Sequence, residues 1–248
     1  MRRLLMLFSL AMIAAPGFAV SADFQAMLNE IDELTTFADG DFSAVYTIIA
    51  ERPGQEREVT QARLFRRDAN DQFLILILQP EVQRGQGYLQ IDENVWFYDP
   101  ESRRFERTTI RESVQGSDAQ NADFNRNSFG SDYRVTDARE GRLGTFDVWI
   151  LDLAATTSGV AYDRVRLWVR KDVPLVLKQE DYSVSGRLMR TSLYPRYERV
   201  GEKLLPKQVL IVDELDEGRR TQLTMSDATT RPIPDSVFTR AYLERVSN

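Results

Sequence analysis

Strand-like runs separated by short turns dominate this sequence, and they constrain its fold more than any other feature. Between Leu64 and Arg107, segments rich in Asp, Asn, Ser and Pro separate three such runs, at 73–78, 88–91 and 95–98. These residue types favour turns because their side chains bond to the local backbone, or because proline fixes φ. The stretch is therefore predicted to be an antiparallel meander. It carries large aromatic residues but no polar cluster of a catalytic kind.

Similar runs continue almost to residue 230, with hairpin tips predicted at 183–186 and 216–218. A large antiparallel sheet tends to curl because the twist of its strands accumulates. We therefore expect a mainly β chain with a few helices, in which about 10–11 strands form one large curved antiparallel sheet, an unclosed β-barrel.

Two amphipathic helices are predicted, one at each end of the chain. The first covers about 23–37, with Asp23 as its N-cap, and Gly40 follows as a stop signal. The second begins at Pro234 and carries an apolar stripe made of Phe238, Ala241, Tyr242 and Val246. Because these stripes have few other partners, we expect both helices to cap the sheet on its concave side.

Two further segments leave alternatives open. The run 73–78 is apolar on both faces, so both sides must be covered. The second cover is a ligand, a helix or a partner, or else simply an additional packed layer. The segment 113–131 is polar and lacks a strand period, so it is either a lid over a site or a simple surface loop.

The N-terminus has the pattern of a secretory signal peptide. Arg2 and Arg3 precede an apolar run from Leu4 to Ala15, and small residues lead to a predicted cleavage after Ala22. The apolar run is shorter than the ~20 residues of a membrane span; an uncleaved anchor is the alternative. Residues 1–22 are thus predicted to be removed on export to the periplasm. No linker interrupts residues 23–248, which we interpret as a single domain.

The chain contains neither Cys nor His. Disulfides, thiol nucleophiles, Ser-His-Asp triads and zinc sites of the usual kind are therefore excluded. The formal charge of −6 argues against a nucleic-acid partner, since phosphate binding needs a basic surface. We predict no catalysis, no cofactor and no metal site; an Asp/Glu pair of the glycosidase kind finds no support in the spacing of the carboxylates.

Several motifs resemble a known family. Residues 95–100, Val-Trp-Phe-Tyr-Asp-Pro, are similar to a hairpin of periplasmic outer-membrane lipoprotein carriers, the LolA-like proteins. Longer matches resemble a branch of outer membrane lipoprotein-sorting proteins and extend over most of the chain, at 60–63, 85–89, 167–172, 188–191 and 211–215. The resemblance implies an unclosed barrel whose apolar cavity is covered by helices and binds acyl chains.

The resemblance also suggests residues for such a site. It implies that Arg66 or Arg67 latches a helical lid and that Phe73 lies near the mouth of the cavity. The apolar residues that we predict to line the cavity are Phe73, Ile75, Leu76, Leu89, Ile91, Val95, Phe97 and Trp149. Trp96 and Phe97 point to opposite faces, so only one of them can line it, and ordinary core packing is the alternative for either.

Three functions follow from these patterns. The first is a soluble periplasmic carrier or chaperone that moves a lipidated protein or membrane lipid toward the outer membrane, with an inner-membrane transporter of the ABC or RND type as partner. Burial of acyl chains, worth ~0.8 kcal/mol per CH₂, would provide the affinity, and a cavity made only of apolar side chains under a movable lid would allow release. The second is an accessory or sensor subunit of such a transporter. The third, an envelope hydrolase, has no candidate residues.

Overall fold

The computed structural model describes residues 23–247, so the predicted signal peptide lies outside the described residues. Three α-helices are present: α1 (Phe24–Thr35), α2 (Phe129–Asp132) and α3 (Arg240–Val246). Four 3₁₀ helices accompany them: η1 (Asp68–Asn70), η2 (Glu81–Gln83), η3 (Asn121–Phe124) and η4 (Asp235–Phe238). The strands are β1 (Asp41–Glu51), β2 (Glu58–Arg67), β3 (Gln72–Gln79), β4 (Gly87–Ile91), β5 (Asn94–Asp99), β6 (Arg104–Thr108), β7 (Tyr133–Leu143), β8 (Phe146–Ala155), β9 (Arg164–Arg170), β10 (Val176–Tyr182), β11 (Leu188–Val200), β12 (Lys203–Asp213) and β13 (Arg220–Thr229).

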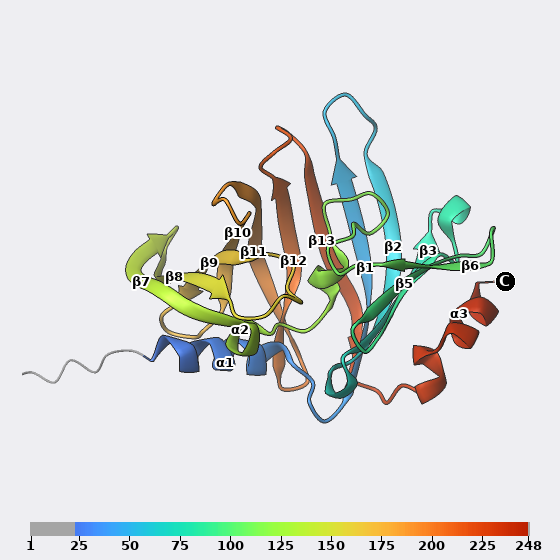
Figure 1. Ribbon diagram of the computed structural model, residues 1–248, viewed down its shortest axis with the longest axis horizontal. Helices are drawn as coiled ribbons and strands as arrows, with labels where there is room; N and C mark the ends of the chain where they lie inside the picture. Colours follow the sequence, from blue (N-terminus) through green and yellow to red (C-terminus); the bar gives the residue numbers. More distant parts are fainter. Residues whose placement is uncertain (1–22, 248) are drawn as a thin grey trace, which may run out of the picture.

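All thirteen described strands belong to one sheet, in the order β6-β5-β4-β3-β2-β1-β13-β12-β11-β10-β9-β8-β7. Every pairing is antiparallel, and β6 and β7 are the two edges, so the curved sheet does not close into a barrel (Figure 1). The predicted fold class, mainly β with one unclosed antiparallel sheet, is confirmed. The sheet has more strands than expected, partly because β6 contains a single large apolar residue, Phe105, and lacks a clear strand signal.

The segment between the two edge strands crosses the concave side of the sheet, and we call residues 109–132 the crossing segment. It contains η3 and α2, and its Val114, Ala119 and Phe124 are buried against side chains of β1 to β5, β12 and β13. The face of the sheet that the crossing segment covers is named the inner face. The polar segment predicted at 113–131 is therefore not a loop directed into solvent, because it is packed inside the curve of the sheet.

Helix α1 also packs on the inner face, as predicted. The Asp23 side chain accepts the backbone N–H groups of Gln25 and Ala26, which caps the first turn. Leu28 and Ile31 are buried against strands β8 and β9, in the half of the sheet that ends at β7.

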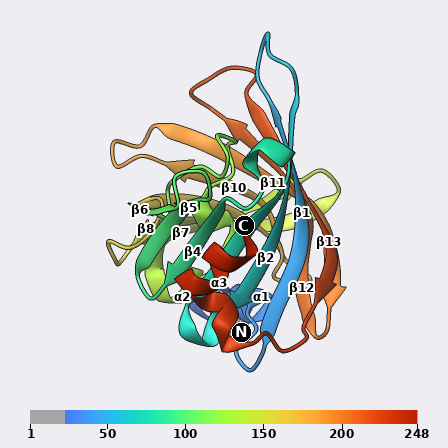
Figure 2. The same cartoon turned by 90° about the vertical axis from the view of Figure 1, so that its right-hand side faces the viewer.

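The C-terminal helices lie on the opposite, outer face, so the expectation that they cap the concave side is wrong. Val237, Phe238 and Leu243 pack against side chains of β3, β4 and β5, and Figure 2 shows α3 in front of these strands. The physical reason is the β3 strand, which is apolar on both faces. Its Phe73 and Ile75 face inward, whereas Leu74 faces the C-terminal helices, which supply the additional packed layer.

Candidate functional site

A cavity of about 1180 Å³ lies on the inner face, between the crossing segment and the strands. Its walls come from most strands between β1 and β13, from the crossing segment and from the β8–β9 loop around residues 157–162. The apolar part of its wall is formed by Val95, Ile110, Phe129, Val160, Val176, Leu205, Val209 and Leu223. Its volume exceeds the roughly 300–1,000 Å³ of typical small-molecule pockets.

The lining of the cavity is not uniformly apolar, in contrast to the expectation from sequence. Five tyrosines line it: Tyr46, Tyr133, Tyr162, Tyr194 and Tyr197. Buried charged groups, among them Asp181 and Arg190, also belong to its wall. The cavity therefore combines apolar surface with hydrogen-bonding groups, which suits an amphiphile better than a pure hydrocarbon.

A buried cluster of one arginine and two carboxylates joins the crossing segment to the sheet. Arg190 on β11 donates from Nε to Asp181 on β10 at 2.7 Å, and from its two terminal nitrogens to Asp123 of η3 at 2.6 and 2.9 Å. Asp181 is fully buried and Arg190 is 6% exposed. Burial raises the pKa of the Asp181 carboxyl, and Arg190 opposes that shift. This Asp-Arg-Asp cluster was not predicted, because a β-bulge next to Tyr182 sets the register that brings Asp181 opposite Arg190.

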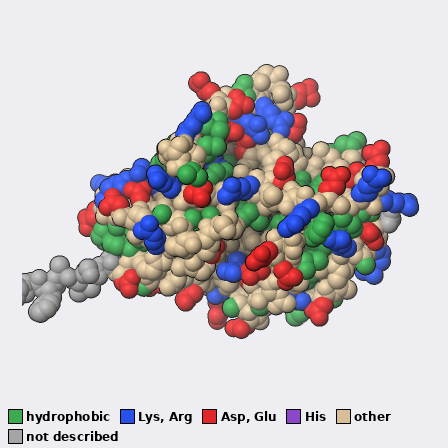
Figure 3. Space-filling model, viewed as in Figure 1, with side chains coloured by type: hydrophobic (Ala, Val, Ile, Leu, Met, Phe, Trp, Pro, Cys, Tyr) green, Lys and Arg blue, Asp and Glu red, His purple; other side chains and the backbone are tan. Residues whose placement is uncertain are grey.

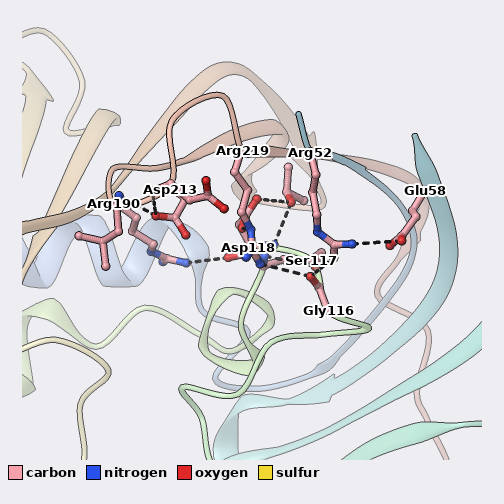
Figure 4. Close-up of polar contacts among 12 residues, drawn as sticks. Arg52, Glu58, Gly116, Ser117, Asp118, Arg190, Asp213 and Arg219 are labelled. Carbon is pink, nitrogen blue, oxygen red and sulfur yellow. Dashed lines mark hydrogen bonds and ion pairs between the residues drawn. The ribbon is translucent and has the colours of Figure 1, made fainter. Parts of the chain in front are cut away.

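A second polar cluster holds the first half of the crossing segment (Figure 4). The Asp118 carboxylate accepts from Arg219 Nε at 2.5 Å and from the buried Thr221 hydroxyl at 2.9 Å. The Thr221 oxygen in turn accepts the backbone N–H of Asp118, and Arg52 donates to the carbonyl oxygen of Gly116. Charged and polar contacts, rather than apolar contacts alone, thus fix this segment over the inner face.

The two arginines predicted as lid latches project to opposite faces of β2. Arg66 lies on the inner face, pairs with Asp68 at 2.7 Å, and donates to the carbonyl oxygens of Thr35 and Asn125. It thereby connects the end of α1 with the crossing segment.

Arg67 lies on the outer face and binds the C-terminal segment. It pairs with Asp41 at 2.7 Å and with Asp235 at 2.6 Å, and its guanidinium lies 4.9 Å from the centre of the Phe238 ring. The Arg67 hydrogen bonds lower the pKa of Asp41, so this pair stays charged over the neutral range. Of these two arginines, only Arg66 lines the cavity.

The predicted lining residues separate into three groups. Phe73, Ile75, Val95 and Phe97 belong to the inner-face cluster that the crossing segment packs against, and of these Val95 borders the cavity. Leu76, Leu89 and Ile91 contact the cluster around the C-terminal helices on the outer face, so they are not part of the lining that we propose. Trp149 lies beneath α1, with the Phe24 ring 5.0 Å away. Strand alternation thus places Phe97 on the inner face and Trp96 on the outer face. There the guanidinium carbon of Arg240 lies 3.7 Å from the centre of the Trp96 ring.

Asp32 connects α1 to the crossing segment. Its carboxylate accepts the backbone N–H groups of Phe129 and Gly130 at 3.0 and 2.7 Å, at the start of α2. Burial raises the pKa of Asp32 to about 6, although these two hydrogen bonds act in the opposite direction.

The stability of the protein should therefore depend on pH through Asp32. An acid whose pKa is higher in the folded state binds more protons when folded, so stability is lost as pH rises from about 4 to about 6. Relative to the Asp32→Asn variant, the wild type should lose at most about 3 kcal/mol over this window. Urea unfolding of both proteins at several pH values measures this difference. A difference that stays constant between pH 4 and pH 7 would contradict the assignment.

Comparisons with known proteins agree with this architecture. A family model described as "-like: Uncharacterized protein" matches residues 69–245. No curated protein matches the sequence. A LolA superfamily protein from Nitrosomonas europaea is similar in structure, with 26% identity and a TM-score of 0.79 over 90% of this chain and 100% of that one.

Two further crystal structures show the same fold at lower identity. One is a putative outer membrane lipoprotein-sorting protein domain from Vibrio parahaemolyticus, with 21% identity and a TM-score of 0.78, covering 89% of this chain and 98% of that one. The other is a DUF1329 family protein from Desulfovibrio piger, with 21% identity and a TM-score of 0.77, covering 88% and 97%.

Proposed function

We propose that this chain, which belongs to the LolA-like outer membrane lipoprotein-sorting family, is a carrier that binds acyl chains between its inner face and its crossing segment. The observation that carries the proposal is the cavity of about 1180 Å³. It adjoins the apolar inner face, and polar contacts help to hold the crossing segment over that face. The fold is that of a carrier or binding protein rather than of an enzyme family.

The crossing segment is the proposed lid. In the described structure the segment packs on inner-face surface that includes Phe73, Ile75 and Phe97. A cargo that binds to this surface would compete with the segment for the same apolar area. Each buried CH₂ contributes ~0.8 kcal/mol, so an acyl chain of ordinary length can offset both the polar contacts of the segment and the burial of its Val114, Ala119 and Phe124. Return of the segment would then favour release.

The cellular setting is part of the proposal. Cleavage after Ala22 would place the protein in the periplasm, with a lipidated protein or membrane lipid as cargo and an inner-membrane ABC- or RND-type transporter as donor. Within residues 23–247, no helix is long and apolar enough to cross a membrane. On the face shown in Figure 3, positively and negatively charged side chains are interspersed, as on a surface with no polyanionic partner.

The cavity can be tested with two valines of one strand. Val209 on β12 borders the cavity, whereas Val212, also half-buried, has its side chain on the other face by strand alternation. Val209→Asp should weaken binding of a fluorescent fatty acid at least tenfold, because the carboxylate would be desolvated against the acyl chain. Val212→Asp is the matched control and should bind like the wild type. Equal binding by both variants would exclude this cavity as the acyl site.

A second function, an accessory or sensor subunit of a membrane transporter, makes a different prediction. It requires a stable complex with a permease and no occupied cavity. Mass spectrometry of lipids extracted from the protein purified from its own cell envelope separates the two functions: stoichiometric lipid supports the carrier, and its absence together with a copurifying permease supports the accessory subunit.

A further inference from the structure

The cavity holds hydrogen-bonding capacity that the protein itself does not use. Tyr46 on β1 has its ring 5.2 Å from that of Phe124, and its hydroxyl has no hydrogen-bond partner among residues 23–247. Burial raises the pKa of Tyr46 to about 12, so the hydroxyl keeps its proton and remains a donor at neutral pH. It is a neutral donor that borders empty space.

Tyr162 provides a second unused group, next to the N-cap of η3. Its hydroxyl accepts from the Gln120 side-chain nitrogen at 2.9 Å, and no acceptor for its own proton is present in the described part of the chain. The Gln120 side chain also caps η3 by accepting from the backbone N–H of Asp123, so its nitrogen is turned toward Tyr162. The Tyr162 proton is therefore free to be donated to a ligand.

The buried arginines around the cavity are already paired. Arg190 is bound by Asp123 and Asp181, and the inner-face Arg66 is bound by Asp68. Four arginines and six carboxylates line the whole cavity: Arg66, Arg107, Arg126 and Arg190, with Asp71, Asp92, Glu93, Asp123, Asp132 and Asp181. An anionic head group would therefore meet no free buried cation and an excess of negative charge, which is unfavourable in a desolvated site.

From these observations we propose that Tyr46 and Tyr162 form a polar subsite of the cavity that binds an uncharged hydrogen-bond acceptor of the cargo, such as an acyl ester, and that the cavity discriminates against anionic amphiphiles. The inference rests on the proposed carrier function and specifies its cargo. The ester carbonyls would accept from the two tyrosine hydroxyls while the acyl chains lie along the apolar wall near Val209 and Leu223.

The test compares two ligands with the same acyl chain, monolauroylglycerol and laurate, by titration calorimetry at pH 8. The wild type should bind the uncharged ester at least tenfold more tightly than the anion. The Tyr46→Phe/Tyr162→Phe variant should bind the ester about tenfold more weakly, with laurate binding unchanged. Tyr197→Phe is the matched control, since the Tyr197 hydroxyl already donates to the Val176 carbonyl oxygen, so its loss should not change the preference for ester over laurate.

The possible results separate the two proposals. Equal affinity of the wild type for both ligands, or a double variant that retains the preference, overturns the polar subsite and leaves the carrier function intact. Failure of both ligands to bind overturns the carrier function and the subsite with it. A diacylglyceryl-cysteine peptide tested beside dilauroylglycerol then identifies the source of the ester: tighter binding of the peptide indicates a lipoprotein, and tighter binding of the glyceride indicates a membrane lipid.

Discussion

Replacement of Arg190 by methionine is expected to lower the free energy of unfolding by ~3–5 kcal/mol. Arg190 is the common partner of Asp123 and Asp181, and its removal leaves the fully buried Asp181 carboxylate without a compensating charge. A methionine fills much of the same space, so the loss reports the uncompensated charge more than a void. Urea unfolding at pH 7, followed by circular dichroism, measures the effect.

A matched control is available on the surface. Arg139 also contacts two aspartates, Asp137 at 3.3 Å and Asp152 at 2.9 Å, but it is 42% exposed. Arg139→Met should therefore cost less than ~1 kcal/mol. An Arg190→Met variant that loses no more than Arg139→Met would show that the buried cluster contributes nothing beyond an ordinary surface pair.

The pH dependence of the Arg190→Met variant gives an independent check. Burial raises the pKa of Asp181 in the wild type, and removal of the opposing arginine should raise it further. Because such an acid binds its proton more tightly when folded, stability is lost as pH rises, and the defect of the variant should shrink as the pH is lowered toward the ordinary pKa of an aspartate. Addition of Asp181→Asn and Asp123→Asn should recover part of the loss at neutral pH, since no charge then remains buried.

The strands and the type of sheet could be predicted from sequence because turn residues and alternation are local signals. The sequence could not predict which face of each strand lies on the inside of the curved sheet. Alternation shows that Phe73 and Leu74 point to opposite sides, but only the three-dimensional path of the C-terminal segment makes Leu74, Leu89 and Ile91 neighbours of α3. Five of the eight predicted lining residues therefore lie on the inner face of the sheet, and three do not.

The polar groups of the cavity escaped prediction for a different reason. Asp181 and Arg190 look like ordinary strand charges in the sequence, and a regular hairpin around 183–186 would not have paired them. The bulge next to Tyr182 shifts the register and creates the pair. The contacts that the crossing segment makes, such as Asp118 with Arg219, join residues about a hundred positions apart, and no periodicity encodes them.

The largest functional effect is expected from loosening the crossing segment. If this segment must leave the inner face before an acyl ligand enters, the apparent dissociation constant is the intrinsic one divided by the fraction of open molecules. Asp118→Ala removes the contacts with Arg219 and Thr221, which hold the closed state by ~1.5–3 kcal/mol. The variant should therefore bind monolauroylglycerol about 10- to 100-fold more tightly than the wild type, up to the point at which the open state predominates.

Tighter binding would identify the crossing segment as a movable lid. If the segment were instead a fixed part of the cavity wall, loss of the contacts that hold it would weaken ligand binding. Calorimetric titration gives the affinity, and hydrogen exchange of residues 109–128 should show reduced protection in the ligand-free variant. Asp172→Asn is the control, since Asp172 pairs with Arg170 at an exposed site and is 64% exposed. Unchanged or weaker binding by Asp118→Ala would mean that the crossing segment forms a permanent part of the cavity, and that cargo enters through the space that is already open between the tyrosines and the apolar wall.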